Sequence, residues 1–182
     1  MNGSLIILPE GFEEIEAITP IDLLRRANVR LTIASLTHPI QVIGRSRVEL
    51  LADGALDAYV NNPYDCVILP GGPGHVNYLN SPILEKFLKS QKGFIAAICA
   101  APVALHKFGM LKGKRFTCHP GEREKLTEAL DQAVVVDGKL ITASGPGAAF
   151  EFGLAIVEVL EGADAARKLS AETGWKAAER NR

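Results

Sequence analysis

The sequence predicts an α/β fold in which helices cover both faces of a mostly parallel β-sheet. The first observation is that the strand-like segments, such as residues 4–9 and 93–98, are nearly continuous apolar runs without polar alternation. The second is that segments with helical spacing alternate with these runs along the chain. The third is that the 182 residues contain no internal repeat, low-complexity stretch or linker. A single domain over residues 1–182 is therefore expected.

The first part of the chain sets up this alternation. Residues 4–9 form an apolar strand run, residues 13–28 have helical spacing, and residues 29–36 form the next strand. Residues 38–53 read as an irregular or hairpin segment, which makes the fold a variant of a doubly wound sheet. Residues 64–72 are a strand that ends in glycines.

The middle of the chain carries clear helix boundaries. Ser81 is expected to be the N-cap of a helix over residues 81–92, because Pro82 stands at the first helical position. Residues 93–98 are a strand, and the helix over residues 100–109 is expected to stop at Gly109.

The last part of the chain adds a hairpin and two helical segments. Residues 115–119 are strand-like, and residues 133–144 predict a hairpin that turns at Asp137 and Gly138. Residues 148–162 have a helical pattern. The tail over residues 163–182 is charged and rich in alanine, with helical propensity.

Composition excludes several classes of protein. The net charge is −1, with 47% hydrophobic and 23% charged residues, so no basic field is available for nucleic acid or an anionic membrane. The apolar run at the N-terminus, Leu5 to Leu8, is shorter than the roughly 7–15 residues of a signal peptide, and no stretch approaches a membrane span. Three cysteines without a C-x-x-C pair argue against disulfides or a zinc site. We expect a cytoplasmic protein without a metal.

The topology of such a sheet predicts where a site would lie. Ligands bind beyond the carboxyl ends of the strands in open α/β sheets. This rule brings together four segments: the one after Leu8, the "PGGPG" after Leu69, Cys99 after Ile98, and the "SGPG" after Ala143.

Cys99 lies at the junction of a strand and a helix, as the nucleophile of a nucleophile elbow does. The positions two before and two after it, which need small side chains in such a turn, are Ala97 and Ala101. A helix N-terminus should lower the pKa of the thiol and favour the reactive thiolate. The alternative is a buried cysteine that only packs. Cys66 and Cys118 are expected to be structural.

Glu16 is expected to face inward, because its row on the predicted helix is mainly apolar. A buried carboxylate must pair or stay protonated, and near a thiolate its pKa would rise. The protonated acid could then donate a hydrogen bond to sulfur. The alternative is that Glu13, Glu14 and Glu16 only enrich the first turn of the helix in negative charge.

Among the four histidines, His119 is the candidate that could reach the site, although a lone histidine is often structural. No metal-ligand spacing and no phosphate-binding motif occurs, since the glycine loops match neither the dinucleotide nor the P-loop pattern. The "PGG" at residues 70–72 instead offers the backbone N–H groups of Gly71 and Gly72 as an oxyanion hole beside the thiol.

The sequence resembles the ThiJ/PfpI superfamily, within the branch of the parkinsonism-associated protein deglycase. The matching motifs are "EEIEAITPIDLLRRA", "YDCVILPGG", "AAICAAP", "HP" and "TASGPGAAFEFGLAIVE", in order between about Leu5 and Gly162. The resemblance implies a flavodoxin-like α/β sandwich that forms homodimers.

The resemblance also implies roles for individual residues. It implies a reactive Cys99 with a protonated Glu16 as its partner, oxyanion donors at Gly72 and Ala100, and a nearby His119. It places Arg26 near the pocket. A further arginine stays ambiguous, because "GRSRVELLAD" can be aligned with Arg45, Ser46 or Arg47 at that position.

Two departures from the family pattern carry information. Ala100 follows the cysteine, where the protease-like and amidotransferase-like branches have histidine, which argues against peptidase activity. Leu51 replaces a cysteine that some relatives carry near the dimer interface, so a thiol pair between subunits is not expected there.

Three functional hypotheses follow. The first is an enzyme similar to glyoxalase III or protein deglycase, a hydrolase or lyase, that uses Cys99 without a cofactor to convert glyoxal, methylglyoxal or their early glycation adducts into 2-hydroxy acids. The second is an oxidative-stress sensor or redox-regulated chaperone that uses the same cysteine. The third is a scaffold domain with an inert thiol.

Overall fold

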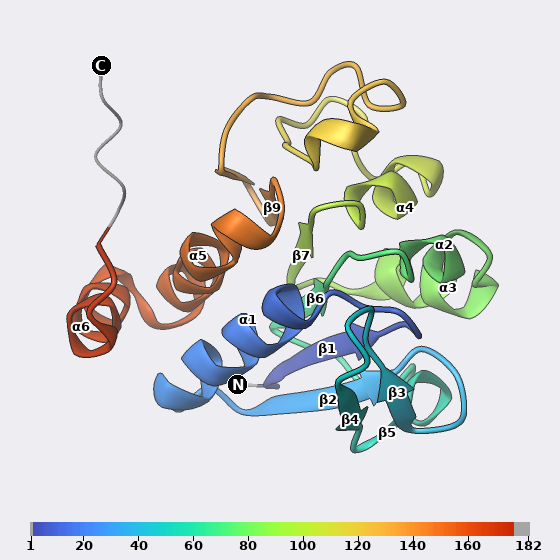
Figure 1. The fold of residues 1–182 in the computed structure, drawn as a ribbon, viewed down its shortest axis with the longest axis horizontal. Helices are drawn as coiled ribbons and strands as arrows, with labels where there is room; N and C mark the ends of the chain where they lie inside the picture. The colour runs from blue at the N-terminus through green and yellow to red at the C-terminus, as the bar shows by residue number, and fades with distance from the viewer. Residues whose placement is uncertain (1, 177–182) are drawn as a thin grey trace.

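The computed structural model describes residues 2–176, which form a seven-stranded sheet flanked by helices and a separate two-stranded hairpin (Figure 1). The strands are β1 (Ser4–Leu8), β2 (Leu31–Ser35), β3 (Gln41–Ile43), β4 (Glu49–Leu51), β5 (Gly54–Ala55), β6 (Cys66–Leu69), β7 (Phe94–Ile98), β8 (Val134–Asp137) and β9 (Leu140–Ala143). The α-helices are α1 (Glu14–Arg26), α2 (His75–Leu79), α3 (Pro82–Ser90), α4 (Pro102–Lys107), α5 (Ala149–Glu161) and α6 (Ala163–Thr173).

The large sheet is parallel except at one edge. Its strand order is β5-β2-β1-β6-β7-β9-β8, and only β8 runs antiparallel to its neighbour. In the register of the central strands, Ile6 of β1 lies between Ile33 of β2 and Ile68 of β6. The central strands β1, β6 and β9 are buried over their full length, which explains their uninterrupted apolar sequence. The predicted fold class is confirmed.

Helices form one layer on each face of this sheet. Figure 1 shows α1, α5 and α6 on one side and α2, α3 and α4 on the other. Each layer encloses its own apolar cluster: Phe152 and Ile156 of α5 belong to the first, and Phe87 of α3 and Leu105 of α4 to the second. In the part of the chain that the structure describes, no helix combines the length and apolarity that crossing a membrane requires.

Most predicted boundaries are confirmed. Ser81 caps α3, because its hydroxyl oxygen accepts a hydrogen bond from the N–H of Leu84 at 3.3 Å. Residues 38–53 contain the antiparallel β3–β4 hairpin. The β8–β9 hairpin turns one residue later than predicted, since Asp137 still pairs with Leu140. The helical tail is confirmed for α6, while residues 177–182 lie outside the described part.

The strand-like segment at residues 115–119 is not a strand. Its backbone bonds go elsewhere: the N–H of Thr117 donates to the hydroxyl of Thr142 at 2.9 Å, and the N–H of His119 donates to the carbonyl of Cys99 at 2.8 Å. This segment therefore crosses the ends of β7 and β9 instead of extending the sheet. This crossing places His119 beside the strand end that carries Cys99.

Candidate active site around Cys99

The carboxyl ends of the central strands bring the predicted segments together. The N–H of Cys99 after β7 donates to the carbonyl of Ala143 at the end of β9, at 2.8 Å. The N–H of Gly71 after β6 donates to Oε2 of Glu16 on α1, also at 2.8 Å. The grouping that topology predicted is therefore confirmed for these segments.

Cys99 adopts the strained conformation of a nucleophile elbow. Its φ is 65°, in the left-handed region that non-glycine residues rarely enter and that costs about 1–3 kcal/mol. The surrounding backbone holds it there, because its N–H binds Ala143 and its carbonyl accepts the N–H of His119. The residue is 9% exposed, so its sulfur is close to the surface but largely desolvated.

Glu16 lies fully buried on the first turn of α1, with its carboxyl group against the thiol. Oε2 accepts the Gly71 N–H, and the carboxyl group hydrogen-bonds with Cys99. Oε1 is buried and has no nitrogen or oxygen partner among residues 2–176. The prediction that Glu16 faces inward is confirmed.

The pKa of Glu16 is raised from 4.5 to about 7, mainly because burial penalises its ionised form. Hydrogen bonds from Cys99 and from the Gly71 N–H lower the pKa, the carboxylate of Glu13 raises it, and Arg45 lowers it. The direction agrees with the sequence-based prediction, but the first cause is desolvation and not a neighbouring thiolate.

The pKa of Cys99 moves in the direction opposite to the prediction. This pKa is raised from 9.0 to about 12, first by burial and then by the charge and hydrogen bond of Glu16, whereas the N–H groups of Gly72 and Ala100 lower it. The N–H groups at the junction act as expected, but desolvation outweighs them. The pKa values of both groups are raised, so burial favours the protonated forms of the thiol and of the carboxyl group.

The backbone donors expected around the sulfur are in place. The N–H groups of Gly72 and Ala100 both hydrogen-bond to Cys99, while the N–H of Gly71 binds Glu16 instead. Gly72 has φ +90°, and a Cβ there would lie 2.5 Å from the backbone N of Glu13. Glycine is therefore required for the loop to approach the site so closely.

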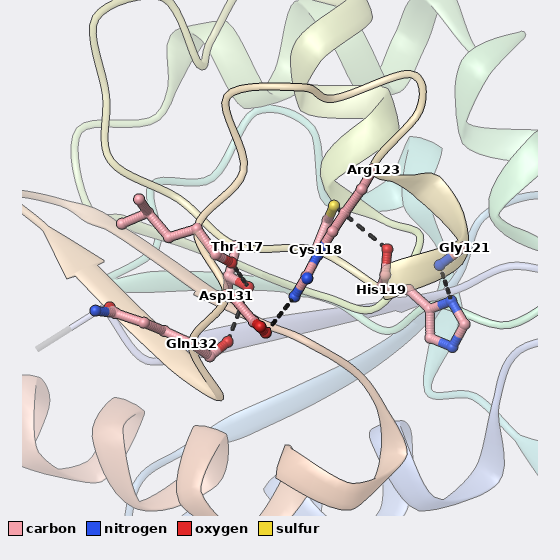
Figure 2. Close-up of polar contacts among 8 residues, drawn as sticks. Thr117, Cys118, His119, Gly121, Arg123, Asp131 and Gln132 are labelled. Carbon is pink, nitrogen blue, oxygen red and sulfur yellow. Dashed lines mark hydrogen bonds and ion pairs between the residues drawn. The ribbon is translucent and has the colours of Figure 1, made fainter.

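His119 lies next to the site, because its N–H binds the carbonyl of Cys99. Its Nδ1 accepts the N–H of Gly121 at 3.1 Å, so the neutral imidazole carries its proton on Nε2. Figure 2 shows the imidazole pointing away from the thiol of Cys118, which is buried, as predicted for a structural cysteine. A Cβ on Gly145 would lie 3.2 Å from the His119 ring, which places the ring over the loop after β9.

The placement of Arg26 near the pocket is wrong within the single chain. Arg26 is the last residue of α1, whereas Glu16 lies on its first turn. Ten residues at about 1.5 Å each separate the two positions by about 15 Å along the helix. Arg26 is exposed and pairs with Asp22 at 2.8 Å.

Of the three residues that the sequence left open, Arg45, Ser46 and Arg47, the structure pairs the side chain of Arg45 with an acidic residue at the start of α1. Its Nη1 lies 3.1 Å from Oε2 of Glu13, and its charge acts on Glu16. Glu13 itself is buried at the start of α1. The adjacent acidic residues were a signal for this arrangement, but only the β3–β4 hairpin decides which residue of the 45–47 stretch faces them. Within residues 2–176, no three His, Cys, Asp or Glu side chains are grouped to hold a metal.

Comparisons with known proteins agree with this geometry. The model of the DJ-1/PfpI family matches residues 4–159. Parkinson disease protein 7 homolog of Danio rerio is 42% identical over 178 residues, which are 92% of this chain and 94% of that protein. Glutathione-independent glyoxalase DJR-1.2 of Caenorhabditis elegans is 40% identical over 177 residues, with coverages of 92% and 94%.

A solved structure extends the comparison to the fold. Oxidised DJ-1 of Toxoplasma gondii superposes with a TM-score of 0.91 at 34% identity, over 96% of this chain and 98% of that one. The flavodoxin-like architecture implied by the sequence resemblance is thereby confirmed. Sequence motifs, topology and site geometry agree, and the chain belongs to the DJ-1/PfpI family.

Proposed function

We propose that the protein converts small reactive dicarbonyls, such as methylglyoxal and glyoxal, into 2-hydroxy acids, with Cys99 as nucleophile and Glu16 as general base. The observation that carries this proposal is the buried carboxyl of Glu16 against the Cys99 thiol, with a pKa of about 7. A base with a pKa near the working pH transfers protons most effectively. The name of the Caenorhabditis elegans relative, a glutathione-independent glyoxalase, supports the same chemistry.

The first step is addition of the thiol to the aldehyde. Sγ of Cys99 forms a bond to the aldehyde carbon of methylglyoxal while the thiol proton passes to the Glu16 carboxylate. The carbonyl π-electrons move to oxygen, next to the sulfur, where the N–H groups of Gly72 and Ala100 stabilise the oxyanion. Protonation of that oxygen gives a hemithioacetal and leaves Glu16 ionised again.

The second step moves hydrogen within the substrate. Glu16 removes the proton from the former aldehyde carbon while the ketone oxygen takes up a proton, which gives an enediol. The hydroxyl on the former aldehyde carbon then loses its proton and a proton returns to the former ketone carbon, with His119 as a second proton-transfer group. The aldehyde carbon is thereby oxidised to a thioester and the ketone carbon reduced to an alcohol, so no external oxidant is needed. Water then cleaves the thioester, which releases lactate and restores the thiol.

The proposal covers free dicarbonyls and their early glycation adducts. In an adduct the aldehyde carbon already carries a thiol or amine, which must leave with a proton and restore the aldehyde before the Cys99 sulfur adds to it. Classification as hydrolase or lyase depends on which of these is the substrate. No cofactor is required, because the redox change stays within the substrate. The cytoplasm, expected from composition, stays a prediction.

Lactate formation by the purified protein tests the proposal. With methylglyoxal, the wild type is expected to form lactate at a rate that falls to the uncatalysed background in Cys99→Ala, because the covalent intermediate cannot form. Cys66→Ala is the matched control, since that thiol is buried in the core, and it should retain activity if it folds. Equal rates in wild type and Cys99→Ala contradict the proposal.

The alternative, an oxidative-stress sensor or redox-regulated chaperone, predicts a different result in the same samples. The solved Toxoplasma gondii relative is described as oxidised, which keeps this alternative relevant. A sensor would form no lactate, and mild peroxide would add about 32 Da, two oxygens, to Cys99 alone. Intact-mass and peptide mass spectrometry distinguish the two outcomes.

We also propose that the protein is a homodimer. Several large apolar side chains are exposed on α1 and on the β3–β4 hairpin that adjoins its start: Ile15, Ile18, Ile43, Val48 and Leu51. Such a patch is typical of an interface. Light scattering should give twice the chain mass, and Leu51→Glu should lower it toward one chain, whereas Ile83→Glu on α3 should not. A monomeric wild type contradicts this proposal.

A further inference from the structure

The loop after β6 presents the N–H groups of two consecutive peptide groups to the site, those between Pro70 and Gly71 and between Gly71 and Gly72. The carbonyl of Pro70 accepts the hydroxyl of Tyr78 at 3.0 Å, and the carbonyl of Gly71 accepts the N–H of Glu13 at 3.1 Å. The N–H groups of these two peptide groups point the opposite way: that of Gly71 binds Glu16 and that of Gly72 binds Cys99. Each peptide group that faces the site is thus held from behind by a hydrogen bond.

The next peptide group, between Gly72 and Pro73, has no N–H, and its carbonyl is held by His75, the first residue of α2. The carbonyl of Gly72 accepts two hydrogen bonds from it, from the backbone N–H at 3.1 Å and from Nδ1 at 2.9 Å. A carbonyl oxygen can only accept, so Nδ1 must carry a proton. Neutral His75 therefore carries its proton on Nδ1 and donates it to the Gly72 carbonyl, whereas neutral His119 carries its proton on Nε2.

This contact lies at a residue whose backbone is intrinsically unrestricted. Gly72 has φ +90°, and glycine restricts its own backbone less than any other residue. Pro73 follows with a fixed φ, so the orientation of the Gly72 carbonyl is the remaining variable. With the Gly71 carbonyl bound to Glu13 and the Gly72 carbonyl bound to His75, neither peptide group beside the Gly72 Cα can rotate.

We propose that His75 is a positioning residue of the reaction: its Nδ1–H holds the Gly72 carbonyl so that the Gly72 N–H stays directed at the sulfur and the oxyanion. The kinetic part of this inference rests on the proposed dicarbonyl chemistry. His75 itself transfers no proton. It acts through Gly72, because a donor displaced by even a fraction of an ångström stabilises the oxyanion less.

Three substitutions at His75 separate positioning from proton transfer. In His75→Asn the amide nitrogen occupies the place of Nδ1 and can donate to the Gly72 carbonyl, although asparagine cannot transfer protons. In His75→Gln the amide nitrogen corresponds to Nε2, and in His75→Ala the donor is absent. We expect kcat for lactate formation to fall about tenfold in the Ala and Gln variants, with KM unchanged, and to stay within about twofold in the Asn variant. Val76→Ala, at the exposed neighbouring position, should match the wild type.

A second measurement does not depend on the substrate. The Gly72 N–H lowers the pKa of Cys99, so its displacement should raise that pKa. The rate of Cys99 alkylation by iodoacetamide is measured by peptide mass spectrometry as a function of pH. The pH profile of this rate should shift to higher pH in His75→Ala and not in His75→Asn. If the wild type forms no lactate, the proposed function fails, but the alkylation series still decides the role of His75. Equal losses in the Asn and Ala variants, or no change in the Ala variant, would overturn the inference. Thermal unfolding of each variant verifies that it is folded.

Discussion

Glu16→Gln is expected to lower the rate of lactate formation by at least about a hundredfold, the usual effect of removing a general base. Glutamine has the shape of glutamate, and its side-chain oxygen can still accept the N–H of Gly71. It cannot accept the proton of the Cys99 thiol, which needs a base because its pKa is raised to about 12. The measurement is kcat at about pH 8, where Glu16 of the wild type is ionised.

Glu14→Gln is the matched control for this experiment. Glu14 lies on the same turn of α1, and its Oε1 accepts the N–H of Ser46, a bond that glutamine can also make. Because it makes no contact with the sulfur, its substitution should leave kcat within about twofold. Equal losses in the two variants would mean that charge at the start of α1 matters, and not a base at position 16.

Glu16→Gln should raise the stability of the fold at neutral pH although it lowers the activity. Burial raises the pKa of Glu16 from 4.5 to about 7, so the folded state holds this proton more tightly than the unfolded chain. The stability of the wild type is therefore complete below about pH 4.5 and declines as the pH rises through 7. The difference in pKa corresponds to about 3 kcal/mol. Glutamine has no such proton, so position 16 contributes no pH dependence of stability in the variant.

Urea unfolding at about pH 4 and about pH 8 tests this linkage. The free energy of unfolding of Glu16→Gln minus that of the wild type should rise by about 3 kcal/mol between the two pH values. A pH-independent difference would contradict the raised pKa. A loss of rate together with a gain in stability is typical of a residue kept for function. Loss of both would instead indicate a packing role.

Local patterns in the sequence were sufficient to single out Cys99 and its backbone conformation. The strand "GFIAAI", the small residues around Cys99 and Pro102 in the first helical turn together require an abrupt change of direction at one residue. The structure has that change at Cys99, with φ 65°. Apolar runs and helical spacing likewise predicted the strands and helices, because burial of continuous strands leaves a direct trace in composition.

Features that depend on tertiary packing could not be predicted in the same way. The direction of the pKa shift of Cys99 depends on how far the thiol is desolvated, which no local pattern reports. The choice among Arg45, Ser46 and Arg47 depends on how the β3–β4 hairpin folds onto Glu13. His75 carried no signal beyond its place after a glycine loop, since its role comes from a contact with the carbonyl of Gly72.

Gly71→Ala is expected to destabilise the fold and reduce activity together. An added Cβ would lie 2.7 Å from Cβ of Cys99, 2.8 Å from Oε2 of Glu16 and 2.9 Å from the carbonyl oxygen of Ile98. These atoms belong to backbone or to buried groups that cannot turn aside, so overpacking should cost about 1–3 kcal/mol of unfolding free energy. The φ of Gly71 is not in the left-handed region, so the effect is steric and not a backbone strain.

The separation of Glu16 from Cys99 decides how Gly71→Ala affects catalysis. The new methyl group would enter between the carboxylate and the thiol, and a displacement of about 1 Å can reduce the rate about a hundredfold. Gly147→Ala is the matched control, because Gly147 also has an ordinary φ and a Cβ there meets no atom within 4 Å. Its stability should stay within about 1 kcal/mol of the wild type. Should Gly71→Ala keep the wild-type kcat, direct proton transfer between Cys99 and Glu16 would not be required, and the base would have to lie elsewhere in the site.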